Sequence, residues 1–166
     1  MKMEQNQINE FMVKAGQGAP DRPTLPPLEV RKGRLKWLAE ELCELANAWS
    51  IEFDLNNSHN TTGNIVLWPA SKPQFSNDTE AITEAYDATI DMLVFAIGNG
   101  VAMGTDLQPG WDEVHTSNMA KFGPGGSIRE DGKVMKPPGW KKPDLASIIA
   151  IQLICAKQRD KQQVLV

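Results

Sequence analysis

Three glutamates form the first group of side chains in this sequence that could do chemistry. Glu40, Glu41 and Glu44 follow an E-E-x-x-E pattern. At about 100° per residue in an α-helix, their carboxylates span about 100° of arc and are offset from the leucine stripe of the same helix. In a helical protein such a pattern is, by itself, typical of a solvated face. A functional interpretation therefore depends on a second acidic set.

A second acidic set lies on another predicted helix. Glu84, Asp87 and Asp91 are spaced i, i+3 and i+7, so they fall within about 60° of arc. The same stripe continues into Val94 and Phe95, and the other sides are also apolar, so we expect Asp91 to be buried. Buried carboxylates without a cation repel one another and lose hydration, which raises their pKa. This arrangement indicates a need for positive charge.

A hard divalent metal ion would supply that charge. Carboxylates without cysteine or clustered histidine suit Mg²⁺ or Mn²⁺, and Mg²⁺ normally acts together with substrate phosphates. A di-iron bundle is the competing metal site, but it needs Glu-x-x-His on two helices. The chain has two histidines, His59 and His115, and only Asp112-x-x-His115 approaches that spacing. A non-catalytic helical module, whose acidic stripes bind a basic partner, is the alternative from a different class.

Helices must position these carboxylates, and the hydrophobic periodicity predicts an all-α fold with four or five helices in a bundle. A proline-rich connector joins the first two helices, and an excursion with five asparagines, residues 51–78, precedes the third. Length favours a single domain over residues 1–166. The predicted helices span residues 5–15, 28–49, 78–103, 109–122 and a last segment that begins near Asp144.

A basic loop follows the fourth predicted helix. Residues 121–142 hold six basic side chains against two acidic ones, a local charge of +4 in a chain whose net charge is −4. Asp131-Gly132 between short β-compatible runs predicts a small hairpin in this loop. We expect the loop to be attracted to anions such as phosphate.

Composition excludes several classes. The 166 residues are 41% hydrophobic and 23% charged, and the longest apolar run, Met92 to Ile97, is too short to span a bilayer. The first residues lack the apolar stretch of a secretory signal, so a cytoplasmic protein is expected. The acidic balance argues against a nucleic-acid coat. Cys43 and Cys155 are expected to be buried thiols.

Several segments together resemble the all-α nucleotide pyrophosphohydrolases, the MazG-like and phosphoribosyl-ATP-pyrophosphohydrolase-like superfamily. The resemblance covers about residues 5–150 and looks strongest to the single-domain branch found in bacteria and phages. It rests on residues 34–45, 84–95, 104–107 and 111–122, and on a tail of residues 128–145 that contains Lys-Pro-Pro-Gly-Trp140.

The resemblance implies a metal site built from both acidic stripes. Glu41, Glu44, Asp87 and Asp91 would hold two or three Mg²⁺ or Mn²⁺ ions, and Glu40 is the candidate general base or a further ligand. The usual second motif is Glu-x-x-Asp. The pair Glu84 and Asp87 satisfies it literally, whereas Asp91 occupies the place of the motif's aspartate in many relatives. Which of these side chains bind metal stays open.

The resemblance also implies contacts to the substrate. Asn118 and Lys121, one turn apart, would address phosphate oxygens, and Arg129 and Lys133 are the phosphate contacts expected from the tail. Trp37 is a candidate for stacking on a base. The alternatives are that Lys121 interacts with a helix dipole, that the tail charges only confer solubility, and that Trp37 belongs to the core.

The implied reaction converts a nucleoside triphosphate, with water, into a monophosphate and diphosphate. Asparagine amides can read a purine edge, and the resemblance to related phage enzymes implies a guanine nucleotide such as dGTP as the first expectation. Phosphoribosyl-ATP and dUTP are the rival substrates. The all-round apolar helix and the family's habit predict a homodimer or homotetramer, a dimer of dimers, with sites at subunit interfaces. No nucleic-acid polymer or membrane partner is expected, and a phage-encoded enzyme would act in the host cytoplasm.

Overall fold

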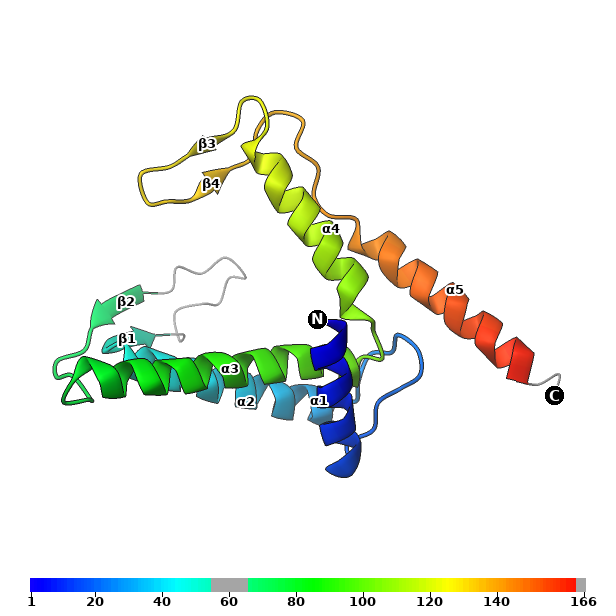
Figure 1. Cartoon of the computed structure of the whole chain (residues 1–166), viewed down its shortest axis with the longest axis horizontal. Coiled ribbons are helices and arrows are strands. Elements are labelled where there is room, and N and C mark those ends of the chain that lie inside the picture. The colour runs from blue at the N-terminus through cyan, green and yellow to red at the C-terminus, as the bar shows by residue number, and fades with distance from the viewer. Residues whose placement is uncertain (55–65, 164–166) are drawn as a thin grey trace. The chain divides into compact units, whose positions relative to one another are not determined.

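The computed structural model describes residues 1–54 and 66–163 and is mostly helical, which confirms the predicted all-α class (Figure 1). By residue contacts the chain divides into two compact units, one made of Met1–Leu25 with Gly100–Val166 and the other of Pro26–Asn99. The helices are α1 (Lys2–Lys14), α2 (Leu28–Ala48), α3 (Asp78–Ala102), α4 (Leu107–Met119) and α5 (Leu145–Gln163), with a 3₁₀ turn η1 (Ala120–Phe122). The strands are β1 (Ile51–Asp54), β2 (Val66–Pro69), β3 (Ser127–Ile128) and β4 (Val134–Met135).

In the unit Pro26–Asn99, α2 and α3 lie side by side (Figure 1). Leu45 and Ala48 of α2 form a core with Ala85 and Ala88 of α3, and Phe75 and Met92 cover its edge. Of the predicted leucine stripe of α2, Leu45 faces this core. Leu35, Leu42 and Trp49 of that stripe are exposed.

A buried arginine joins the beginning of α2 to the end of α3. The Arg34 side chain is only 7% exposed, and its Nε donates to Oδ1 of Asn99 at 2.6 Å. Its Nη2 donates to the carbonyl oxygen of Phe95 at 3.1 Å. Burial lowers the pKa of Arg34 from its usual value, so these hydrogen bonds must offset the lost hydration.

The first turn of α3 is capped by side chains. The backbone N–H of Glu80 donates to Oδ1 of Asn77 at 3.0 Å, and the Ser76 hydroxyl donates to Oε2 of Glu80 at 2.8 Å. These bonds from Ser76 lower the pKa of Glu80. The Asn77 side chain is therefore the cap, three residues before the N–H from which it accepts.

A hairpin, β1 paired antiparallel with β2, occupies the described ends of the asparagine-rich excursion. Ile51 pairs with Pro69 and Glu52 with Trp68, whose indole N–H donates to Oε2 of Glu52 at 2.8 Å. This hairpin was not predicted. Four of the five asparagines lie outside the described residues.

In the other unit, Ile8 and Met12 of α1 pack against Val101 and Ala102. Gly104 follows with φ +64°, and a β-carbon there would collide with the carbonyl oxygens of Pro20 and Arg22. Only glycine fits this position, because the connector passes directly against its backbone.

The predicted hairpin and last helix are both present in this unit. Ser127 pairs with Met135 and Ile128 with Val134. The Asp144 carboxylate caps α5, accepting from the backbone N–H of Ser147 at 3.1 Å and from its hydroxyl at 2.6 Å.

Cys43 and Cys155 are free thiols and exposed, so their predicted burial was wrong; each lies on a helix side that this chain does not cover. In the described parts of the chain no single helix is long and apolar enough to cross a membrane, and only α3 and Leu107–Phe122 taken together, as two halves of a broken span, meet that criterion by length and composition.

Candidate functional site

The unit Pro26–Asn99 holds all six predicted acidic side chains, and the charges of four of them raise the pKa of a fifth, Glu41. Partial burial raises the pKa of Glu41, and the negative charges of its neighbours raise it further. The charges of Asp87 and Asp91 on α3 act on the Glu41 carboxylate on α2, so the two acidic stripes lie close enough to interact. We call these five the acidic cluster: Glu40, Glu41 and Glu44 from α2, and Asp87 and Asp91 from α3.

Burial differs within the acidic cluster. Glu41 and Asp91 are partly buried, whereas Glu44 and Asp87 are exposed. Asp91 was expected to be buried, but the apolar sides of α3 are themselves open in this chain, so its carboxylate keeps access to solvent. Glu84 is exposed and contributes nothing to the shift at Glu41.

The donor chemistry of the acidic cluster suits a hard cation. All its ligating atoms are carboxylate oxygens, and the repulsion at Glu41 is the cost of gathering them without positive charge. In residues 1–54 and 66–163, no three carboxylates, imidazoles or thiolates converge closely enough, as they stand, to hold a metal ion. Glu40 and Glu44 are exposed, so their side chains can change rotamer.

Glu40 differs from its neighbours because it has a cationic partner. The Nζ of Lys36 lies 3.4 Å from Oε1 of Glu40, one helical turn earlier, and both side chains are half or more exposed. An exposed pair of this kind contributes roughly 0–1 kcal/mol, so it does not prevent Glu40 from turning toward a substrate.

Trp37 of α2 contacts an aromatic side chain of α3. Its ring stacks on Phe95 with centroids 5.8 Å apart and an interplanar angle of 28°. Trp37 is partly buried, so the indole is only in part accessible to a base. Base stacking by Trp37 stays a prediction.

The predicted phosphate-binding residues lie in the other unit, and the structure brings two of them together. Lys121, on η1, donates from Nζ to Oδ1 of Asn118 near the end of α4 at 2.8 Å. The amide and the ammonium therefore form one polar group at this helix end. An anion that binds here meets a donor from each side chain.

The two tail residues of the hairpin differ from each other. The Arg129 guanidinium forms two hydrogen bonds with the Asp131 carboxylate, the one from Nε to Oδ1 at 2.8 Å. This contact raises the pKa of Arg129 and lowers that of Asp131. Within the described residues the Lys133 ammonium has no such partner, so of the two it is better placed to bind an external anion.

Sequence reasoning missed two groups. The Arg34–Asn99 pair joins the helices that hold the acidic cluster, and nothing in the sequence distinguished Arg34 from the other charged residues of α2. Trp140 is the second: the Nζ atoms of Lys121 and Lys136 lie 5.5 Å and 4.6 Å from its ring centroid. Such contacts between distant positions leave no periodic signal in a sequence.

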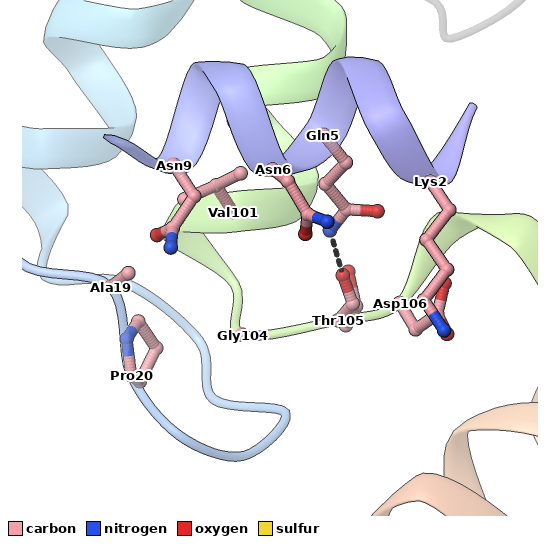
Figure 2. A pocket seen from close by; sticks show the side chains of 10 residues that line it. All are labelled: Lys2, Gln5, Asn6, Asn9, Ala19, Pro20, Val101, Gly104, Thr105 and Asp106. Atoms are coloured by element: carbon pink, nitrogen blue, oxygen red, sulfur yellow. Dashed lines mark hydrogen bonds between the residues drawn. The ribbon is translucent and has the colours of Figure 1, made fainter. Parts of the chain in front are cut away.

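A pocket of about 280 Å³ lies between α1, the connector and residues 101–106 (Figure 2). Gln5 is fixed in its wall, where Nε2 donates to the Thr105 carbonyl at 2.6 Å and Oε1 accepts from the Leu107 N–H at 3.1 Å. A second pocket, of about 400 Å³, lies between α4 and residues 137–142. None of the predicted site residues lines either pocket.

Comparison with known protein families gives one match. A family model described as phosphoribosyl-ATP pyrophosphohydrolase matches residues 8–118, about two thirds of the chain. No match was found among curated proteins. The matched range contains α2, α3 and all but the last residue of α4, and with them the whole acidic cluster and Asn118.

Proposed function

Because the chain belongs to the phosphoribosyl-ATP pyrophosphohydrolase family, whose members hydrolyse a phosphoanhydride bond, we propose that it cleaves nucleoside triphosphates between the α and β phosphates. The products would be a nucleoside monophosphate and diphosphate. The observation that carries this proposal is the family match over residues 8–118, which includes the carboxylates of α2 and α3 whose charges act on Glu41. A site that gathers negative charge in this way is suited to bind a polyphosphate through divalent cations.

Each part of the site has a role in this proposal. Enzymes of the family are generally metal-dependent, and we assign Mg²⁺ or Mn²⁺ to Glu41, Glu44, Asp87 and Asp91, with Glu84 as the alternative ligand. When bound, the ions neutralise phosphate charge and acidify a water molecule. Glu40 accepts the proton of the attacking water.

The remaining predicted residues bind the substrate. Asn118 and Lys121 address phosphate oxygens as one hydrogen-bonded pair, and Lys133 adds a further cation. Arg129 contributes after it exchanges its contact with Asp131 for a phosphate, which offers the same bidentate geometry. Trp37 borders the base.

For the base we propose a purine deoxynucleotide, with dGTP as the first substrate to test. A second substrate, phosphoribosyl-ATP, is favoured by the description of the matching family. Both carry a triphosphate on a purine nucleoside, so the same carboxylates and cations serve either.

We also propose that the enzyme is a homodimer or homotetramer and acts in the cytoplasm. Exposed apolar residues recur at seven-residue intervals along α2 and at the residue that follows it, and we call them the heptad stripe. The heptad stripe consists of Leu28, Leu35, Leu42 and Trp49, each at least 41% exposed. In the described residues no large side chain is fully buried. Helices with apolar stripes this open are stabilised by a partner.

The test is a panel of dGTP, dATP, dCTP, dUTP, GTP and phosphoribosyl-ATP with Mg²⁺ or Mn²⁺, with diphosphate release as the readout and EDTA as the control. We expect metal-dependent release of diphosphate, fastest with dGTP. Equal turnover of all deoxynucleotides would contradict the base preference. No cleavage of any substrate, together with a Tm unchanged by EDTA or added metal, would instead favour a non-catalytic module that binds a basic partner.

A further inference from the structure

Trp140 is held in place by the end of α4. Its indole N–H donates to the carbonyl oxygen of Ser117 at 2.8 Å, and the Ser117 hydroxyl donates to the carbonyl oxygen of Lys141 at 3.1 Å. Ser117 is 8% exposed and Trp140 is partly buried. These two bonds run in opposite directions between the same segments, so they fix the indole relative to the last turn of α4.

Two lysines from different segments share this indole. The Nζ atoms of Lys121, on η1, and Lys136, after β4, lie 5.5 Å and 4.6 Å from the ring centroid. The distance between the two Nζ atoms is therefore at most the sum of these two distances. Their attraction to the ring holds two like charges near each other.

The charge of the two lysines is not neutralised within the described part of the chain. Neither ammonium forms an ion pair there, and Lys121 donates only to the neutral amide of Asn118. Two carboxylates of the same unit have other partners: Asp131 binds Arg129, and Glu113 accepts the backbone N–H of Asp144. An anion with several charged oxygens would relieve the repulsion between the two ammonium groups.

We propose that Lys121 and Lys136, gathered on Trp140, form a binding site for condensed phosphate, with Trp140 as its positioning residue. The new members are Lys136 and Trp140, neither of which the sequence assigns a role. The proposal rests on the proposed function for the source of the ligand, which is either the polyphosphate chain of the substrate or the released diphosphate. A condensed phosphate has oxygens for both ammonium groups, whereas chloride does not.

Calorimetric titration of the full chain with inorganic diphosphate, in EDTA, tests the site apart from metal and turnover. We expect K121A and K136A each to weaken binding at least about tenfold, because each removes one of two charged donors. Trp140→Leu should weaken it similarly, and Trp140→Phe less, because phenylalanine keeps a ring face. Lys136→Arg should retain binding. Lys157→Ala, an exposed lysine on α5, is the matched control and should bind as the wild type does.

Two results would overturn the site: K136A that binds diphosphate as tightly as the wild type, or K157A that weakens binding as much as K136A. Circular dichroism of each variant identifies any that fail to fold; if Trp140→Leu does, K136R against K136A decides. If the proposed function fails, no triphosphate is cleaved, yet binding of diphosphate in EDTA is still measured.

Steady-state kinetics then distinguish the two sources of the ligand. A raised KM for the nucleotide with little change in kcat in K136A assigns the site to the substrate's phosphate chain. An unchanged KM with weaker inhibition by diphosphate assigns it to the product.

Discussion

At the scale of single residues, Glu41 is the side chain most affected by its neighbours. Because burial and like charges raise its pKa, its charged form destabilises the metal-free protein at neutral pH. We expect Glu41→Gln to reduce turnover by more than the roughly 10–100-fold that loss of an outer metal partner costs. In EDTA its free energy of unfolding should equal or exceed that of the wild type. Chemical denaturation and diphosphate release measure the two effects.

The control for this prediction is Glu29→Gln, which removes one charge from the first turn of α2, away from the acidic cluster. It should leave turnover unchanged. A Glu41→Gln enzyme with full activity would remove Glu41 from the site, and a large loss of stability in EDTA would show that like-charge repulsion is not what raises its pKa.

A second prediction at the scale of single residues concerns whether Asp87 or Asp91 contributes more to metal binding. Asp91 raises the pKa of Glu41 more than Asp87 does, and it is the more buried of the two. We therefore expect Asp91→Asn to weaken Mn²⁺ binding more than Asp87→Asn does, as measured by calorimetry. The reverse order would support the literal Glu84-x-x-Asp87 motif.

The chemical type of the site residues was predictable from the sequence, whereas the contacts between separate segments were not. The carboxylates of α2 and α3 follow from helical spacing, since residues three, four and seven apart share a face. The contacts of Trp37 with Phe95 and of Lys136 with Trp140 depend on where separate segments meet, and residue spacing carries no record of that.

At the scale of elements, the predicted helices match the structure to within a few residues because glycine, proline and capping side chains mark their ends. Strands β1 and β2 were missed. Each has four residues, too few for alternation to stand out, and the intervening asparagines favoured a loop. Hydrophobic periodicity identified α2 as a helix, but it did not distinguish the side that packs on α3 from the side left exposed.

The N-terminus of α5 gives a pH-dependent prediction. Hydrogen bonds from Ser147 lower the pKa of Asp144 below its ordinary value of 3.8. The carboxylate therefore stabilises the fold above that pH, and the contribution is lost as pH falls through the lowered folded-state pKa. We expect Asp144→Ala to lower Tm at pH 7, with a gap from the wild type that narrows below pH 3.8 in thermal unfolding followed by circular dichroism.

Asp144→Ser separates the charge of this cap from its geometry. Serine also accepts a backbone N–H at a helix start but does not titrate. The difference in Tm between Asp144→Ser and Asp144→Ala should therefore not narrow as the pH falls. A gap between the wild type and Asp144→Ala that stays constant down to low pH would contradict the assignment.

At the scale of the whole molecule, the exposed heptad stripe of α2 predicts self-association. Leu35, at its centre, is 67% exposed. A charge there would be buried against a partner, so we expect Leu35→Glu to lower the mass measured by analytical ultracentrifugation and to reduce activity. Leu25→Glu, on the connector at 72% exposure, is the matched control and should leave the mass unchanged. A wild-type monomer would contradict the proposed assembly.

The two exposed thiols also have a consequence for how the protein behaves outside a reducing environment. Cys43 lies on α2 and Cys155 on α5, so each chain offers two separate points for intermolecular disulfides. In the sense used in polymer chemistry, the chain is a bifunctional monomer: oxidation can link chains into a growing series, whereas a chain with one thiol stops at a linked pair. Storage in air therefore favours covalent multimers of increasing size, and replacing either cysteine by serine limits the product to a covalent dimer.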